Sequence, residues 1–330
     1  MKYTSIEHIL EAFNEVKVLI IGDVMVDAYI WGAVERISPE APVPVVRATR
    51  RDFRLGGAAN VALNIQALGA NPLLCAVVGD DDDGKRFAER LKEKDITHEG
   101  IVVSNERPTT VKTRIMTAHQ HVVRVDEETD RLLSSNEEEA LWSKIEQMLP
   151  SADVIIFEDY DKGVLSPALI EKAVKLAGQH GIPTVVDPKK RNFLDYNGVT
   201  LFKPNLKELK EGLKVDFDKN DQAAIESAVE RLLSELQCKG TLITLSERGV
   251  YIRYKEERHL IPAHIREISD VSGAGDTVIS IAALAVALDL DPYLIAALSN
   301  LGGGLVCEHI GVVPINKSDL QKEALKHNWL

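Results

Sequence analysis

The strongest constraint on the fold is the alternation of short apolar runs with amphipathic stretches along most of the chain. The run Val16–Val24 predicts a buried strand that ends in a polar loop, whereas Gly57–Ala70 has helical spacing and closes at Gly69. Another helix is predicted over Pro167–His180, between two further strands. This order favours a mostly parallel sheet with helices on both faces. The 330 residues allow one large α/β domain with an appendage or two ordinary domains.

Polar residues follow several of the predicted strands. The carboxyl ends of parallel strands meet at one edge of a sheet, and ligands of α/β proteins bind outside that edge. The residues expected at this edge are Asp23, Asp27, Asp159, Asp187, Asn205 and Ser246. Their convergence is stronger evidence for a ligand site than any one of them alone.

Two stretches break the alternation. Tyr29–Gly57 and Thr109–Glu128 have strand character without helices between them, and Pro42 and Pro44 suit an edge or a bulge rather than a central strand. We expect these segments to form a small β-sheet that projects from the main body over the ligand edge.

Composition excludes several classes of function. The formal charge of −12 and an aromatic content of 5% argue against binding to nucleic acid. A phosphorylated ligand must therefore meet local hydrogen-bond donors or a metal ion. The first 16 residues carry several glutamates, no apolar run has membrane-spanning length, and the three cysteines have no metal or disulfide spacing. We expect a cytoplasmic protein without a membrane partner.

The stretch Asp270–Leu288 places a glycine-broken turn directly before an almost uncharged helix. A helix N-terminus has unpaired N–H groups and partial positive charge, and Gly273 and Gly275 let an anion approach the backbone. Asp276 adds a carboxylate beside this cradle, as phosphoryl transfer to a hydroxyl requires. We expect the helix dipole to lower the pKa of Asp276. An aspartate that merely caps a helix after a glycine turn is the plain structural alternative.

The stretch "DVSGAGD" is similar to the second signature of the ribokinase-like (carbohydrate kinase PfkB) family, and "GGAANVALNIQALGA" from Gly56 resembles the first. The resemblance covers nearly the whole chain. It implies a single ribokinase-like kinase domain over residues 1–330, with lid segments at about 29–57 and 109–128. It also implies that Asp276 is the catalytic base and that the backbone of Gly273, Ala274 and Gly275 is the anion hole.

The same resemblance implies ATP and Mg²⁺ as cofactors. "NLKE" matches the family motif that organises magnesium and phosphates through water, with Glu208 as the metal-side carboxylate; a capping box explains the tetrapeptide equally well. The loop "TLSERG" resembles the nucleotide loop but also suits a hairpin turn, and the glycines after Asn300 also suit close helix packing. The nucleotide-binding candidates are Asn205, Leu206, Lys207, Glu208, Ser246, Gly249, Asn300 and Gly311.

The sugar site is predicted at the first signature and the first strand. Asp27 matches the family aspartate that binds sugar hydroxyls, and Asp23 is a second candidate, with a loop cap as its alternative. The other wall is predicted at Gly56, Gly57 and Asn60, although Asn60 also suits an exposed helix face.

A distal phosphate on the sugar would need cations. The basic candidates are Lys189, favoured by its place after a strand, with Lys190, Arg191, Arg124 and Arg114. Runs of charged residues are most often solvated surface. Solvated surface is therefore the alternative for the stretch "PKKRN", which contains Lys189, Lys190 and Arg191.

Within the family, "GDVMVDAYIWGAVERISPEAPVPVV" resembles the kinases of D-glycero-D-manno-heptose 7-phosphate, although Ser272 stands where those kinases commonly have threonine. This implies transfer of phosphate to C1 on the route to ADP-heptose and the lipopolysaccharide core. We expect a separate protein to perform the adenylylation, and a homodimer formed through the lid. Two alternatives are a kinase of the same family for another sugar, sugar phosphate or nucleoside, and a non-catalytic sugar-binding regulator.

Overall fold

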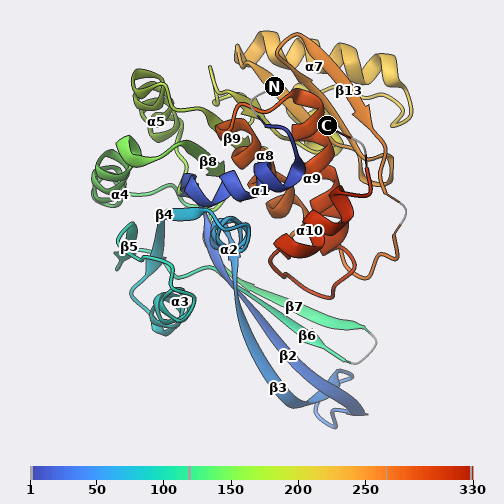
Figure 1. Ribbon diagram of the computed structural model, residues 1–330. Coiled ribbons are helices and arrows are strands. Elements are labelled where there is room, and N and C mark those ends of the chain that lie inside the picture. The colour runs from blue at the N-terminus through green and yellow to red at the C-terminus, as the bar shows by residue number, and fades with distance from the viewer. Residues whose placement is uncertain (1–2, 118–119, 265, 328, 330) are drawn as a thin grey trace.

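The computed structural model describes residues 3–117, 120–264, 266–327 and 329, and these residues form a nine-stranded and a four-stranded sheet (Figure 1). The large sheet has the strand order β13-β12-β11-β10-β9-β8-β1-β4-β5. Its strands are β1 (Lys17–Gly22), β4 (Asn71–Gly79), β5 (Ile101–Ser104), β8 (Val154–Glu158), β9 (Thr184–Asp187), β10 (Leu201–Phe202), β11 (Gly240–Thr244), β12 (Val250–Tyr254) and β13 (Glu257–Ile261). All neighbours from β5 to β11 are parallel, and β12 and β13 extend the sheet antiparallel. The mostly parallel sheet predicted from the alternation is confirmed.

Helices cover both faces of this sheet because successive strand residues point to opposite sides. In β1, Val18 and Ile20 face a core shared with α2, α8 and α9, whereas Leu19 and Ile21 face a second core shared with α4, α5 and α7. The helices are α1 (Ile6–Ala12), α2 (Ala58–Ala67), α3 (Asp82–Glu93), α4 (Ser135–Met148), α5 (Pro167–His180), α6 (Leu206–Leu213), α7 (Gln222–Leu236), α8 (Ala274–Ala287), α9 (Pro292–Val306) and α10 (Lys317–Ala324).

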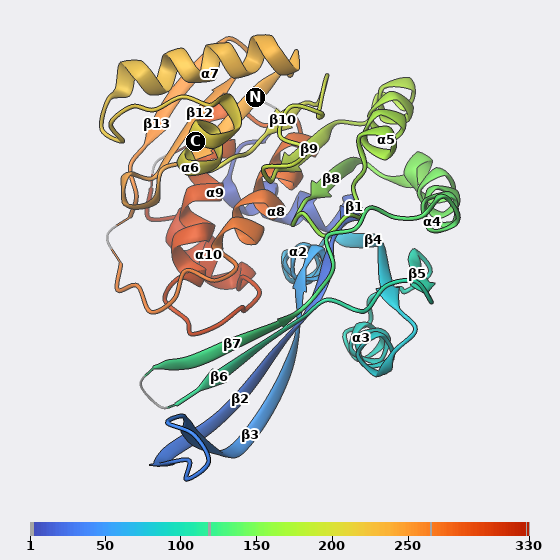
Figure 2. The ribbon, with the colours of Figure 1, turned by 180° about the vertical axis from the view of Figure 1, so that it is seen from behind.

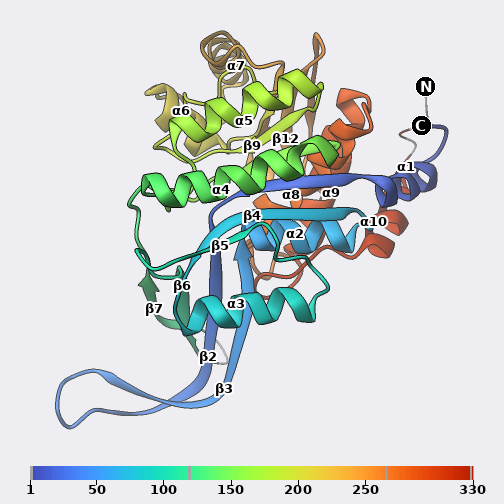
Figure 3. The ribbon, with the colours of Figure 1, turned by 90° about the vertical axis from the view of Figure 1, so that its left-hand side faces the viewer.

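The small sheet projects from the body, and the β2–β3 hairpin reaches furthest (Figures 2 and 3). Its strands are β2 (Val24–Ile37), β3 (Pro44–Gly57), β6 (Val111–Met116) and β7 (His121–Glu127), in the order β3-β2-β6-β7. The projecting β-sheet predicted from the sequence is confirmed, with β2 starting five residues earlier than expected, at Val24. Residues 118 and 119 of the expected segment lie outside the described residues.

The small sheet has two different faces. The register places Asp27 and Tyr29 of β2 beside Lys112 and Arg114 of β6 on one face. Val26 of β2 belongs to the other face, whose inner end joins the main core. One face of the projection is therefore polar and rich in cations, and the other is apolar.

No helix among the described residues is long and apolar enough to cross a membrane. The three cysteines are buried and free. The expected cytoplasmic location stays a prediction.

The junction of β1 with β8 is among the tightest backbone contacts. A Cβ on Gly22 would lie 2.0 Å from the carbonyl oxygen of Glu158, which is the last residue of β8. The carbonyl of Glu158 accepts the N–H of Asp23 at 3.0 Å, so the chain leaves β1 directly against the end of β8. Only glycine allows this approach, which brings the loops after these two strands together.

We expect Gly22→Ala to lower the free energy of unfolding by about 3 kcal/mol, because the added methyl forces two central strands apart. The matched control is Gly178→Ala in α5, where a Cβ would meet no described atom within 4 Å. There alanine should raise stability by about 0.5–1 kcal/mol, since it removes a helix-interior glycine. Denaturant unfolding of both variants tests this; equal stability of Gly22→Ala and the parent would contradict it.

Candidate active site

Asp276 lies in the first turn of α8, beside strands β8 and β9, and its side chain is 5% exposed. Asn60 of α2 donates from Nδ2 to its Oδ2 at 2.6 Å, and Tyr160 donates from its hydroxyl to Oδ1 at 2.8 Å. Each carboxylate oxygen therefore has a fixed donor and retains a further lone pair. The arrangement orients the carboxylate and leaves it able to accept another hydrogen bond.

The start of α8 has the geometry of an anion site. Gly273 has φ 79°, in the left-handed region that favours glycine, and among the described residues no side chain caps the helix. A Cβ on Gly275 would lie 3.6 Å from Asp187 and 3.8 Å from the Lys203 ammonium, so a cation lies next to this helix start. Ala274 donates its N–H to the carbonyl of Val271 at 3.3 Å, and the Lys203 ammonium is bound to Asp187. The other backbone N–H groups of this helix start and the ammonium together suit a phosphoryl group.

The pKa of Asp276 differs from the expectation. Burial raises it above its ordinary value, the hydrogen bonds from Asn60 and Tyr160 oppose the rise, and the charge of Asp187 adds to it. The predicted lowering by the helix dipole is wrong, because loss of hydration outweighs the favourable field at the helix start. Asp276 is consequently a better base than the sequence suggests.

Two further carboxyl groups lie beneath this helix start, on paired positions of β8 and β9. Asp187 binds the Lys203 ammonium at 2.7 Å. Glu158 is fully buried, and neither of its carboxyl oxygens has a hydrogen-bond partner among the described residues. Burial, followed by the charges of Asp187 and Asp276, raises the pKa of Glu158 well above its usual range. Glu158 therefore favours its neutral form.

The "NLKE" segment forms a capping box. This was the structural alternative to its predicted role in organising magnesium and phosphates. Asn205 accepts the N–H of Glu208 at 2.8 Å, and Glu208 accepts the N–H of Asn205 at 2.8 Å. The second oxygen of Glu208 binds the Lys189 ammonium at 2.8 Å. Although burial opposes its charge, Asp187 and Glu208 raise the pKa of Lys189, so Lys189 stays cationic. In the described part of the chain, no group of three or more His, Cys, Asp or Glu residues could hold a metal directly.

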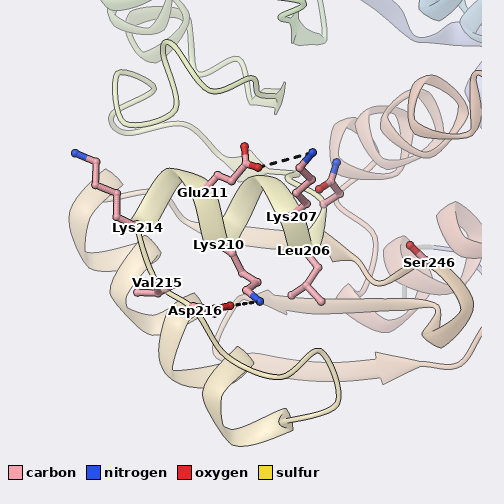
Figure 4. A pocket seen from close by; sticks show the side chains of 9 residues that line it. Leu206, Lys207, Lys210, Glu211, Lys214, Val215, Asp216 and Ser246 are labelled. Atoms are coloured by element: carbon pink, nitrogen blue, oxygen red, sulfur yellow. Dashed lines mark ion pairs between the residues drawn. The ribbon is translucent and has the colours of Figure 1, made fainter.

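A cavity of about 790 Å³ lies along α6 and is shown in Figure 4. Four nucleotide-binding candidates line it, namely Asn205, Leu206, Lys207 and Ser246. Lys207 and Lys210 in its wall are paired with Glu211 and Asp216. The space and its lysines suit an anionic ligand that extends from the start of α6 toward the β11–β12 turn.

The other nucleotide candidates have structural partners. Gly249 has φ 91° in the turn of the β11–β12 hairpin, the alternative considered for that loop. Asn300 donates from Nδ2 to the carbonyl of Pro262 at 2.8 Å, and Gly311 donates its N–H to Asp270 at 2.9 Å. A Cβ on Gly302 would lie 2.1 Å from Ile281, so the glycines after Asn300 permit close packing of α8 on α9.

The sugar-side candidates Asp27, Gly56, Gly57 and Asn60 lie in β2, at the end of β3 and in α2. Asp27 is buried, forms an ion pair with Arg114, and closely approaches Gly56, where a Cβ would lie 2.2 Å from its Oδ2. Gly57 has φ 59°, which glycine favours, at the start of α2. Asn60 is fully buried and donates to Asp276, which rules out the exposed helix face that was the alternative to its predicted role in the sugar site.

Three charged residues that were predicted to bind the sugar phosphate have protein partners instead. Asp23 accepts three backbone N–H groups of the loop after β8, so the cap considered as its alternative describes it better than a sugar ligand does. Lys189 lies against Glu208 and Asp187, beside the nucleotide candidates rather than Asp27. Arg124 is 57% exposed and pairs with Asp126 on β7, opposite Arg114 of β6.

The sequence reasoning missed Tyr160, Lys203 and the buried acid Glu158 as parts of the site. Tyr160 and Glu158 lie in the stretch "FEDYDKG", and Lys203 lies in "LFKPN". Their position at or just beyond the ends of the apolar strands β8 and β10 was the available signal, since buried parallel strands that end at one edge bring their terminal side chains together.

Comparisons with known proteins identify the family of the chain. Residues 16–318 match the family described as pfkB family carbohydrate kinase. The bifunctional protein HldE of Syntrophotalea carbinolica is 38% identical over 332 residues, covering 100% of this chain and 67% of that protein. HldE of Citrifermentans bemidjiense is 37% identical, covering 98% of this chain and 66% of that protein. The chain thus spans about two thirds of the length of these curated relatives.

Solved structures show the same fold. Phosphofructokinase-2 from Escherichia coli, in complex with potassium, matches with a TM-score of 0.78 at 17% identity, covering 93% of this chain and 97% of that chain. Ribokinase from Arabidopsis thaliana, complexed with ribose and ATP, matches with a TM-score of 0.72 at 16% identity, covering 93% and 99%. The sequence resemblance is confirmed, and the chain belongs to the pfkB family of carbohydrate kinases.

Proposed function

We propose that the protein transfers the terminal phosphoryl group of ATP to C1 of D-glycero-D-manno-heptose 7-phosphate, giving the 1,7-bisphosphate. The observation that carries the kinase chemistry is the buried Asp276 carboxylate beside the uncapped start of α8. The choice of sugar rests on the likeness of the first strand and lid segment to heptose kinases, and on the matches to HldE over nearly the whole chain.

Asp276 accepts the proton of the acceptor hydroxyl in this proposal. The freed oxygen forms a bond to the terminal phosphorus of ATP while the bond from that phosphorus to the ADP oxygen breaks. The amides at Gly273, Ala274 and Gly275, with the Lys203 ammonium close to Gly275, hold the transferred group as its charge redistributes.

The nucleotide occupies the carboxyl edge between α6 and α8. Asn205, Leu206, Lys207 and Ser246 line the cavity there, and Lys189 supplies positive charge. Glu208 fits a Mg²⁺ ion held through water, because its oxygens serve the capping box and Lys189 and no direct three-carboxylate cage is found among the described residues. When bound, Mg²⁺ neutralises charge on the phosphates.

The sugar lies between this edge and the polar face of the small sheet. Asp27 is suited to binding sugar hydroxyls, and Arg114 beside it offers a planar donor group. A distal phosphate is expected on the same face, where Arg114 and Lys112 of β6 and Arg124 of β7 share one side of the sheet. This face supplies the local cations that an acidic chain must present to a sugar phosphate.

The small sheet acts as a lid that excludes water during phosphoryl transfer. It also provides the interface of a homodimer in the cytoplasm. Support for the second role comes from apolar residues that the projection exposes, namely Val34, Ile37, Val43, Val123 and Val125. Burial of such side chains between two copies would remove apolar surface from water.

Asp276→Asn should lower kcat by about 10²–10⁴-fold, because the amide cannot accept the hydroxyl proton. Sugar binding should be largely kept, since the side-chain shape is unchanged. ATP consumption and calorimetric sugar binding measure the two effects. The control is Asp289→Asn at the exposed opposite end of α8, where asparagine tolerates the φ of 57°. Equal turnover of both variants would defeat the proposed role of Asp276, whereas sugar binding without ATP consumption by the parent would favour a non-catalytic sugar-binding protein.

The substrate assignment is tested by ATP consumption with a panel of acceptors. Heptose 7-phosphate should give the highest kcat/KM, ahead of fructose 6-phosphate, ribose and a nucleoside. Ribose and the nucleoside lack a distal phosphate for the cations, and fructose 6-phosphate carries its phosphate one carbon nearer to C1. Heptose lacking the 7-phosphate should lose at least about tenfold in kcat/KM, the value of one charged hydrogen bond. A comparable kcat/KM with fructose 6-phosphate would contradict the heptose assignment and indicate a kinase of another sugar phosphate.

A further inference from the structure

The loop between β8 and α5 is held by two buried carboxylates. One is its own Asp159, which accepts the N–H of Asp161 at 2.8 Å. Asp23, immediately after β1, accepts the N–H groups of Tyr160 at 2.8 Å, Lys162 at 3.1 Å and Val164 at 3.1 Å. Within this loop Asp161 has φ 55° and Gly163 has φ 84°, both in the left-handed region. Three amides held by one carboxylate fix the loop in this unusual path.

The fixed loop presents the side chain of Tyr160 to the proposed catalytic base. Its hydroxyl donates to Oδ1 of Asp276 at 2.8 Å, and the Lys189 ammonium lies 5.3 Å from the centre of its ring. Tyr160 thus connects three parts of the site: the loop that Asp23 organises, the carboxylate at the start of α8, and the lysine beside Glu208.

We propose that Tyr160 is a positioning residue for Asp276, and that Asp23 serves the reaction by holding the Tyr160 loop rather than by binding sugar. This inference rests on the proposed role of Asp276 as proton acceptor. Asn60 fixes Oδ2 of the carboxylate and Tyr160 fixes Oδ1, so the orientation of the carboxylate is set by two segments that are far apart in the sequence, α2 and the loop after β8. A base held in this way needs no reorganisation when the hydroxyl arrives.

The phenol also balances the charge of the site. The ionisable groups around Asp276 are Glu158 of β8, Asp187 of β9, Lys203 after β10, and Tyr160 itself. Burial and the neighbouring acids Asp276, Glu158 and Asp187 raise the pKa of Tyr160 well above its ordinary value, so it remains a protonated donor. Its hydrogen bond opposes the rise in the pKa of Asp276 that burial causes. Without the phenol, the base should be protonated up to a higher pH.

The test is the pH profile of kcat/KM for Tyr160→Phe, with ATP and the best sugar of the panel. Asp276 must be unprotonated to act, so activity falls as the pH drops through its pKa. The acidic limb of Tyr160→Phe should move upward by about one pH unit, which corresponds to one hydrogen bond to a charged group. The loss relative to the parent should therefore be about tenfold larger at the bottom of the limb than on the plateau. Ionisation of the substrates affects every variant equally and cancels in this comparison.

The matched control is Tyr196→Phe. Tyr196 is fully buried, whereas Tyr160 is partly exposed, and like Tyr160 it donates its hydroxyl to an aspartate at 2.8 Å, but that aspartate is Asp159 rather than Asp276. It should lose comparable stability and leave the limb in place. Asn60→Ala, which removes the other donor to Asp276, should move the limb in the same direction as Tyr160→Phe and serves as the second variant if Tyr160→Phe unfolds.

The outcomes separate this inference from the proposed function. If the acidic limb of the pH profile stays in place in Tyr160→Phe while Asp276→Asn loses activity, the role of Tyr160 is overturned and the role of Asp276 as the base stays intact. Equal shifts in Tyr160→Phe and Tyr196→Phe would reduce the effect to general destabilisation and overturn it as well. If instead Asp276→Asn keeps full turnover, the base itself is lost and the inference falls with it.

Discussion

The site depends on one buried carboxylate that is held from two sides. Asp276 would be costly to bury unpaired, and the fold meets that cost with a donor from α2 and a donor from the loop after β8. Those donors reach it because the parallel strands end at one edge and because Gly22 lets β1 and β8 lie in close backbone contact there. The same apolar packing that makes α8 a central helix therefore gives its first turn a base stronger than an exposed aspartate.

The sequence allowed the parts of this structure that depend on local pattern to be predicted. Apolar periodicity is local, so it predicted the large sheet and the projecting strands, and the glycine turn before an apolar helix indicated Asp276. The missed features depend on contacts between distant positions. Tyr160 and Asp276 are separated by 116 residues, and Asp23 by 137 from the first of its amides. The burial that raises the pKa of Asp276 and hides Asn60 arises only when α2, α8 and the strands assemble, so it has no signature in either segment alone.

Several motifs had both a functional and a structural interpretation, and the geometry shows that the two coexist. The capping box of Asn205 and Glu208 uses one oxygen of Glu208 and leaves the other to Lys189, so a helix cap also orients a cation at the site. The loop cap formed by Asp23 positions Tyr160 on the base. A residue that caps a helix or a loop at the carboxyl edge of a parallel sheet is rigid by virtue of that structural role, and rigidity is what a site for phosphoryl transfer needs.

The cations of the site are paired with acids, which constrains what can bind. Lys203 is paired with Asp187, Lys189 with Glu208, Arg114 with Asp27 and Lys112 with Glu128. A phosphate group that enters must compete with these carboxylates, so binding exchanges one ion pair for another and gains little from a single contact. A ligand that contacts several of these cations gains from several exchanges at once, whereas a ligand that contacts one of them gains little.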